Sequence, residues 1–266
     1  MKTLKLAVIG KDVSKSASPQ MHKFIAENMG FKVEYEKLSI PQEQFESSVE
    51  NLFNEFDGFN VTIPYKLSII PHLNNVCGDA SVYSAVNTVL TSDKSGYNTD
   101  GLGFALMLEN AGVKVNGKSV LLLGAGGAGR SVAKKLADGG ASVFVYDKLI
   151  QNAQAVAKEF SAVALEEIEN KSYDIIINAT GIGMHKTEGI SPVGERLLSL
   201  CGVAVDLIYE PKESKFLQIA HSLGKQTVNG EAMLFYQAYY AECIYHGIQP
   251  NSLNAKQLFE RYTEEI

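Results

Sequence analysis

The sequence predicts an α/β fold, and two observations carry that prediction. Residues 119–123 form an apolar run that stops at a glycine-rich turn, and a helical pattern of apolar residues begins directly after the turn. From about residue 113 onwards, strand-like runs alternate with helical patterns, which is typical of a parallel sheet covered by helices. The chain has 266 residues, enough for one large domain or two ordinary ones.

The glycine-rich turn points to a bound anion. Gly124, Gly126 and Gly129 fit the spacing G-x-G-x-x-G between a strand and a helix. In that setting the glycines let the backbone approach a pyrophosphate at the helix N-terminus, where unpaired N–H groups favour negative charge. Asp147 closes the next predicted strand, which favours a dinucleotide. The alternative is a glycine-rich turn in some other α/β domain.

Composition excludes several other classes of protein. Apolar residues make up 45% of the chain and charged residues 20%, as in ordinary globular proteins. The net charge is −6 and no basic stripe is present, so we expect no nucleic acid partner. No apolar run is long enough to span a membrane. Three cysteines without a C-x-x-C spacing favour a reducing cytoplasm, and five scattered histidines predict no metal site.

The first predicted elements are a strand over residues 4–9 and a helix from Pro19 to Met29. Ser18 precedes Pro19, which predicts that Ser18 is the N-cap of this helix. Ser16 and Ser18 also lie on the loop that leaves the carboxyl end of the strand. Their hydroxyls and the helix dipole would suit a carboxylate ligand, although capping alone would explain Ser18.

A strand over residues 33–38 and a helix over residues 45–56 come next. The following strand, residues 58–63, ends at Pro64. Thr62 and Lys66 should therefore stand at the carboxyl edge of the sheet, where open α/β sheets bind ligands. Lys66 could instead be an ordinary surface lysine.

Residues 84–90 and 96–100 read as a β-hairpin, and a helix follows Asp100. Asp100 could be a simple helix N-cap. In the second half we predict strands over residues 120–123, 142–146, 174–178, 203–207 and 227–228, and helices over residues 129–138, 151–160 and 215–223. Two further helices, residues 231–246 and 253–265, close the chain, and their sequence does not say which domain they pack on.

These motifs together resemble the shikimate dehydrogenase family, including its quinate/shikimate relatives. The resemblance covers nearly the whole chain, and the motifs occur in the family's order. They are Ser16-Ala17-Ser18-Pro19, Asn60-Val61-Thr62-Ile63-Pro64-Tyr65-Lys66, Ala85-Val86-Asn87-Thr88, Asn98-Thr99-Asp100, the Gly124 to Gly129 turn, Asn178-Ala179-Thr180, Asp206-Leu207-Ile208-Tyr209, Gly230-Glu231-Ala232-Met233-Leu234 and Gln237.

The resemblance implies a two-domain oxidoreductase of the shikimate pathway, which leads to chorismate and the aromatic amino acids. A substrate-binding α/β domain would comprise residues 1–101 with 236–266, where the C-terminal helix returns to the first domain. A Rossmann-like domain would comprise residues 102–235. The implied reaction is the reversible NAD(P)-dependent reduction of 3-dehydroshikimate to shikimate in the cytoplasm, by a monomer or homodimer without a metal.

The resemblance also assigns roles to single residues. Lys66 and Asp100 would be catalytic, with Lys66 as the acid and base. The substrate would be bound by Ser16, Ser18, Thr62, Asn87, Asp100, Tyr209 and Gln237. The dinucleotide would be bound by Gly124, Ala125, Gly126, Gly127, Ala128, Gly129, Asp147, Lys148, Thr180, Ile208 and Gly230.

At one position the sequence departs from the family. Members that use NADP usually carry Asn-Arg-Thr after the second Rossmann strand, where this chain has Asp147, Lys148 and Leu149. A carboxylate accepts from a ribose 2′-hydroxyl and repels a 2′-phosphate, and Lys148 would offset this only in part. Because of Asp147, we therefore expect the chain to use NAD, or to use both NAD and NADP, whereas the family more commonly uses NADP.

Three alternatives stay open at this point. The first is an NAD-dependent, catabolic quinate/shikimate dehydrogenase. The second is a non-catalytic relative that senses shikimate or quinate, although such a protein would not need both Lys66 and Asp100. The third is an unrelated Rossmann dehydrogenase, which would not explain the ordered motifs in the first hundred residues.

Overall fold

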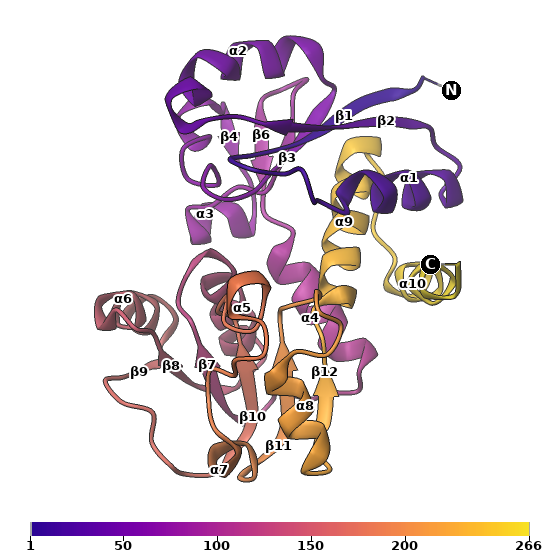
Figure 1. Cartoon of the computed structure of the whole chain (residues 1–266). Helices are drawn as coiled ribbons and strands as arrows, with labels where there is room; N and C mark the ends of the chain where they lie inside the picture. The colour runs from indigo at the N-terminus through magenta and orange to yellow at the C-terminus, as the bar shows by residue number, and fades with distance from the viewer. Residues whose placement is uncertain (1, 266) are drawn as a thin grey trace. The chain divides into compact units, whose positions relative to one another are not determined.

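The computed structural model describes residues 2–265, which form two compact units (Figure 1). Unit 1 comprises Met1–Thr99 with Phe235–Ile266, and unit 2 comprises Asp100–Leu234. Unit 1 contains a mixed sheet and unit 2 a parallel sheet, so the predicted α/β class is confirmed. From Phe235 onwards the C-terminal helices belong to unit 1, so the chain returns to the first domain as the resemblance implied.

The sheet of unit 1 has six strands in the order β2-β1-β3-β5-β6-β4. The strands are β1 (Leu4–Gly10), β2 (Val33–Ser39), β3 (Gly58–Val61), β4 (Asn75–Val76), β5 (Thr88–Leu90) and β6 (Ser95–Tyr97). Strand β1 pairs in parallel with both β2 and β3, whereas β5 runs antiparallel to β3 and β6. The carboxyl ends of β1 and β3 and the start of β5 therefore meet at one edge of the sheet.

Alternating side chains of β1 bury both faces of this sheet. Ala7 and Ile9 belong to a core with helix α2 (Phe45–Glu55), whose apolar residues recur at helical spacing. Leu6 and Val8 face the other way, into a core with helix α9 (Glu231–His246). Because both faces are covered, the central strand carries no exposed side chain between residues 6 and 10.

The remaining helices of unit 1 are α1 (Ser18–Asn28), α3 (Asp79–Tyr83) and α10 (Ser252–Glu265). The prediction that Ser18 caps α1 is wrong. The N-cap is Ala17, no side chain of the described residues caps the helix, and Ser18 is the first helical residue. The physical reason is that the Ser18 hydroxyl accepts a hydrogen bond from the Ser16 hydroxyl instead of bonding the backbone of α1.

Unit 2 contains a wholly parallel sheet in the order β12-β11-β10-β7-β8-β9. Its strands are β7 (Ser119–Leu123), β8 (Ser142–Tyr146), β9 (Val163–Leu165), β10 (Tyr173–Asn178), β11 (Cys201–Asp206) and β12 (Gln226–Val228). Its helices are α4 (Asp100–Asn110), α5 (Gly127–Asp138), α6 (Ile150–Phe160), α7 (Glu195–Leu198) and α8 (Lys215–Ser222). Two short elements of unit 2, β9 and α7, were not predicted from the sequence, because three or four residues are too few for a clear pattern.

The strand order of unit 2 reverses between β7 and β10. From β7 the chain continues outward to β8 and β9, and then returns to the other side of β7 at β10. Helices α7 and α8 cover one face of the sheet through Leu197, Leu198, Phe216, Leu217 and Ala220. In an open parallel sheet such a reversal leaves a crevice at the carboxyl ends of the two strands, and this edge is where a ligand is expected.

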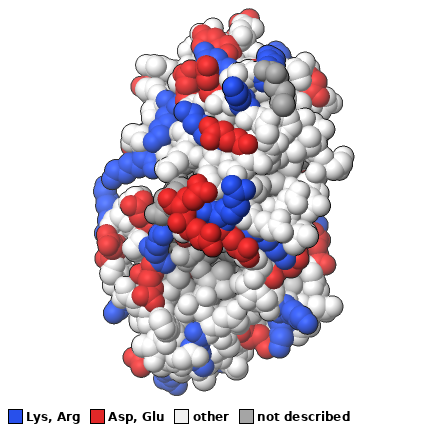
Figure 2. Space-filling model, turned by 90° about the vertical axis from the view of Figure 1, so that its right-hand side faces the viewer, with Lys and Arg blue, Asp and Glu red and all other residues white. Residues whose placement is uncertain are grey.

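Within residues 2–265, no helix combines the length and the apolar character needed to cross a membrane. On the face drawn in Figure 2, acidic and basic side chains are interspersed, and neither sign covers an extended area.

Candidate functional site

The first group of predicted residues gathers at the edge of the unit 1 sheet where β1 and β3 end. There the chain approaches itself closely: a Cβ on Gly10 would lie 2.6 Å from Cγ2 of Thr62. The Thr62 N–H donates to the Ile9 carbonyl at 2.9 Å, so Thr62 continues the β3 pairing by one residue. The half-buried Thr62 side chain thus stands beside the loop that leaves β1.

Ser16 and Ser18 form a local pair on that loop. The Ser16 hydroxyl lies 3.0 Å from the Ser18 hydroxyl, and the Ser18 N–H donates to Ser16 Oγ at 3.2 Å. Both side chains are half-buried at the N-terminus of α1. Two hydroxyls beside a helix N-terminus can bind a carboxylate, since hydroxyl donors and the helix dipole both favour negative charge.

Lys66 lies in the turn that follows β3. The preceding Tyr65 anchors this turn, because its ring stacks on Phe45 with centroids 4.2 Å apart and its hydroxyl donates to the Ile40 carbonyl. The Lys66 carbonyl accepts from the Val86 N–H at 2.8 Å, which fixes its backbone next to the start of β5. The Lys66 side chain is half-buried, unlike the exposed lysine that the alternative reading expects.

Asn87 and Gln237 meet although 150 residues separate them. Asn87 Nδ2 lies 3.4 Å from Gln237 Oε1 and 3.0 Å from the Thr99 hydroxyl. Asn87 is 2% exposed and sits just before β5, and Gln237 projects from α9. The structure therefore brings two of the predicted substrate residues together at the same sheet edge as Thr62 and Lys66.

The glycine-rich turn of unit 2 joins β7 to α5. Gly124 has φ +97°, a conformation that favours glycine, and Gly126 is the N-cap of α5. A Cβ on Gly129 would lie 2.1 Å from the Gly124 carbonyl oxygen, so only glycine fits there. Among the described residues no side chain caps α5, and its first turn carries no acidic residue. These features leave backbone N–H groups available for phosphate.

Asp147 follows β8 and is bonded to this turn. Its carboxylate accepts from the Ala125 N–H at 2.8 Å, from the Leu149 N–H at 2.9 Å and from Asn152 Nδ2 at 3.2 Å. Burial raises the pKa of Asp147, but these three hydrogen bonds outweigh burial and leave the pKa below its usual value. Asp147 is therefore ionised at neutral pH, and Lys148 beside it is exposed.

The loops after β10 and β11 lie at the same edge of the sheet as the glycine-rich turn. The Thr180 hydroxyl donates to Asn178 Oδ1 at 2.6 Å, and Asn178 in turn donates to the fully buried Asp206 at 3.0 Å. Asp206 also accepts from the Ile208 N–H at 3.0 Å. The Gly230 N–H donates to the Ile208 carbonyl at 3.0 Å. Thr180, Ile208 and Gly230 are thus connected through a buried carboxylate at the edge where Gly124 lies.

Two further predicted residues, Asp100 and Tyr209, lie in unit 2. Asp100 is the first residue of α4, is 8% exposed, and belongs to unit 2, whereas Lys66 belongs to unit 1. Tyr209 follows β11 and is half-buried, and burial together with Glu210 raises the pKa of its hydroxyl.

Three buried polar residues support the site, although the sequence motifs that contain them assigned them no role. Asn60 is 6% exposed, accepts from the Tyr35 hydroxyl at 2.7 Å and donates to the Asn87 carbonyl at 3.2 Å. Asp206 and Asn178 perform the same function in unit 2. A signal existed, because each is a polar residue in or at the end of an apolar strand, where an unpaired polar group is costly.

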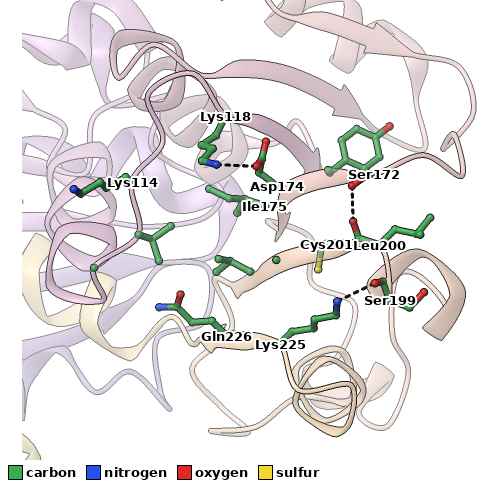
Figure 3. A pocket seen from close by; sticks show the side chains of 15 residues that line it. Lys114, Lys118, Ser172, Asp174, Ile175, Ser199, Leu200, Cys201, Lys225 and Gln226 are labelled. Atoms are coloured by element: carbon green, nitrogen blue, oxygen red, sulfur yellow. Dashed lines mark hydrogen bonds and ion pairs between the residues drawn. The ribbon is translucent and has the colours of Figure 1, made fainter.

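A large cavity of about 690 Å³ lies at the opposite, amino edge of the unit 2 sheet (Figure 3). Lys118 pairs there with Asp174 at 2.9 Å, and Lys225 donates to the Ser199 carbonyl at 2.8 Å. These lysines are already engaged, and most of the lining is exposed. The cavity is separate from the glycine-rich turn, and the predicted residues do not line it.

Asp174 in this cavity should stabilise the sheet in a pH-dependent way. Hydrogen bonds from the Ser119 backbone, Lys118 and the Ser119 hydroxyl lower the pKa of Asp174 to about 2. Its contribution is present above the ordinary pKa and is lost as pH falls towards 2. Because the side chain is 40% exposed, we expect Asp174→Asn to lower the free energy of unfolding at pH 7 by about 1 kcal/mol.

Urea unfolding of both proteins at pH 7 and pH 3 measures this difference. We expect this difference to shrink by about half at pH 3, since Asp174 is then mostly protonated in the unfolded chain while it is still mostly ionised in the folded protein. A difference that stays constant or grows on acidification would contradict the assignment.

Comparison with known proteins gives concordant matches. Residues 8–89 match the family described as shikimate dehydrogenase substrate binding domain, and residues 106–187 the family described as shikimate / quinate 5-dehydrogenase. The chain is 38% identical over 260 residues to the shikimate dehydrogenase (NADP(+)) of Carboxydothermus hydrogenoformans, with 91% of each chain covered.

Solved structures agree with the sequence matches. Shikimate 5-dehydrogenase from Thermus thermophilus, in complex with NADP(H) and shikimate, superposes with a TM-score of 0.88 at 34% identity, covering 97% of this chain and 99% of that one. Shikimate 5-dehydrogenase from Listeria monocytogenes, in complex with shikimate and NAD, superposes with a TM-score of 0.83 at 25% identity, covering 97% and 96%. Relatives of this fold therefore bind either dinucleotide.

Proposed function

The chain belongs to the shikimate dehydrogenase family, and on this premise we propose that it interconverts shikimate and 3-dehydroshikimate with NADP or NAD. It is an oxidoreductase that acts on a CH–OH group and serves the shikimate pathway towards chorismate and the aromatic amino acids. In unit 1 we place the substrate, and in unit 2 the dinucleotide.

One observation carries the proposal for the substrate. Hydroxyl, amide and ammonium groups lie at one edge of the unit 1 sheet, although they come from separate loops, turns and helices. They are Ser16, Ser18, Thr62, Lys66, Asn87 and Gln237. Such a set suits a small polyhydroxylated acid, because the hydroxyls can bind its carboxylate and the amides its ring hydroxyls.

The proposed chemistry needs a proton carrier beside the reacting oxygen. A bound nicotinamide would supply the acceptor for the hydride that leaves C3 of shikimate. In that direction Lys66 Nζ would take the proton of the C3 hydroxyl, and in reduction an ammonium at Lys66 would return it. The ammonium would also stabilise negative charge on the oxygen, and Asp100 would orient the hydroxyl. Tyr209 completes the proposed substrate set.

The glycine-rich turn fits a dinucleotide. The uncapped start of α5 suits its pyrophosphate, and the close packing of Gly129 on Gly124 leaves no room for a side chain. Around it we assign Ala125, Gly126, Gly127, Ala128, Asp147, Lys148, Thr180, Ile208 and Gly230 to dinucleotide binding. The ionised Asp147 supports use of NAD, while the NADP-linked relatives support NADP, and we propose that both are accepted.

Two further properties are proposals. The chain would act in the cytoplasm, which its three free cysteines Cys77, Cys201 and Cys243 support. It would act as a monomer or homodimer.

Initial rates of shikimate and quinate oxidation by purified protein, each with NAD and with NADP, test the proposal. We expect turnover of shikimate with both dinucleotides and a preference for NAD. Comparable rates with quinate would assign the protein to the catabolic quinate/shikimate type. If no combination of substrate and dinucleotide gives turnover while shikimate still binds, the protein is a non-catalytic sensor and not an enzyme.

A further inference from the structure

A buried carboxylate between two histidines lies in unit 1 behind the proposed substrate edge. Glu242 of α9 has a fully buried side chain, and His22 of α1 is equally buried. His22 Nδ1 lies 2.6 Å from one carboxylate oxygen of Glu242, and His246 Nε2 lies 3.1 Å from the other. None of these three residues belongs to the predicted site.

This contact controls the orientation of His22. Within the described part of the chain, Glu242 is the only side-chain hydrogen-bond partner of His22, because Nε2 of the same ring is buried without one. The other contacts of the ring are with aromatic side chains: it stacks on Tyr35 with centroids 4.5 Å apart and approaches Tyr245 at 6.5 Å. Stacking alone leaves a ring free to turn in its plane, whereas the bond to Glu242 fixes it.

The carboxylate is held as an ion. Burial raises the pKa of Glu242, but hydrogen bonds and charge from His22 and His246 outweigh burial and leave the pKa below its usual value. Removing one partner of a buried ionised group strongly destabilises the fold, so the hydrogen bond between His22 and Glu242 holds α1 and α9 together. We call this hydrogen bond the tie between the two helices.

Both helices carry proposed substrate residues. His22 lies one helical turn after Ser18 on α1, and Glu242 lies five residues after Gln237 on α9. Tyr35 links α1 to the sheet, because it forms hydrogen bonds with both Ser18 and Asn60. Burial and the charge of Glu242 raise the pKa of Tyr35, and the hydrogen bond with Ser18 opposes that rise. Asn60 bonds the Asn87 carbonyl, and Asn87 contacts Gln237. The tie between His22 and Glu242 closes this ring of contacts.

We propose that Glu242 is a positioning residue for substrate binding: through His22 it holds α1 against α9, so that the Ser16 and Ser18 hydroxyls keep a set distance from Gln237. This inference rests on the proposed function. It assigns Glu242 a part in the affinity for shikimate, not in the chemical step or in dinucleotide binding.

Steady-state kinetics of four variants tests the proposal. Glu242→Leu and His22→Leu each remove the tie, and we expect the KM for shikimate to rise about tenfold in each, with kcat within about threefold and the KM for the dinucleotide unchanged. Glu242→Gln keeps an acceptor for His22, so its KM should rise less. The double variant H22L/E242L should have a KM no higher than either single variant, because both act through one contact.

Val49→Ala is the matched control. Val49 is buried in the core between α2 and the other face of the same sheet, so its truncation destabilises unit 1 without touching the tie. We expect its KM for shikimate to equal that of the wild type at a similar loss of thermal stability.

The outcomes separate the inference from the proposed function. Turnover of shikimate by the wild type tests the proposed function. The ratio of the KM for shikimate in a variant to that in the wild type tests the positioning role of Glu242. An unchanged shikimate KM in Glu242→Leu, or an equal rise in both KM values, would overturn the positioning role. If Glu242→Leu does not fold, Glu242→Gln and the shift of its melting temperature by shikimate carry the test.

Discussion

Lys66→Ala should reduce kcat for shikimate oxidation by about a thousandfold or more, because proton transfer and charge stabilisation are lost together. The fold should persist, since Tyr65 anchors the turn through Phe45 and Ile40 and only the Lys66 backbone takes part in the pairing with Val86. Initial rates and dinucleotide binding by fluorescence titration measure the two effects separately. Binding of the dinucleotide should stay within about twofold of the wild type.

Lys23→Ala is the control for this prediction. Lys23 is an exposed residue of α1 in the same unit, so its loss changes the net charge equally. We expect its kinetics to match those of the wild type. Turnover by Lys66→Ala close to the wild-type rate would remove Lys66 from the mechanism and with it the proposed acid and base.

The second large effect concerns the choice of dinucleotide. We expect the double variant D147N/K148R to raise kcat/KM with NADP relative to NAD by about 10- to 100-fold. A carboxylate near a 2′-phosphate costs roughly 1–3 kcal/mol at a partly exposed site, and arginine adds a bidentate contact. Asparagine at position 147 keeps an acceptor for the Ala125 N–H, so the turn should retain its conformation. The ratio of the two kcat/KM values is the measurement.

Asp138→Asn is the control for charge alone. Asp138 lies at the far end of α5 and pairs with Lys134, so its removal changes the net charge without altering the glycine-rich turn. The ratio of kcat/KM with NADP to kcat/KM with NAD should stay at the wild-type value in this variant. The effect at Asp147 should also weaken as ionic strength rises, since partly exposed charges are screened. A ratio that does not move would show that Asp147 takes no part in dinucleotide choice.

Much of the architecture was predictable because it follows from local periodicity. The apolar run before Gly124, the strand at residues 142–146 and the helical spacing of residues 45–56 each correspond to an observed element. Backbone geometry sets these repeats at two and 3.6 residues, so they can be read in any short window of sequence. Four short elements, β4, β9, α3 and α7, were not predicted, because two to five residues are too few to show a repeat.

The cap of α1 shows where local patterns mislead. Serine before proline favours an N-cap, yet Ser18 turns its hydroxyl towards Ser16. Local propensity is a small energy, and contacts made elsewhere in the fold outweigh it.

Sequence pattern alone was enough to predict the order of the longer strands and helices along the chain, the glycine-rich turn at Gly124 and the list of polar residues at strand ends. Only the folded molecule decided which polar residues meet: Asn87 meets Gln237 across 150 residues, and His22, which was not predicted, meets Glu242 across 220. The first kind of information lies in neighbouring residues, since it depends on backbone geometry. The second depends on how sheets and helices pack, because burial selects the partner of a polar group without regard to its distance along the chain.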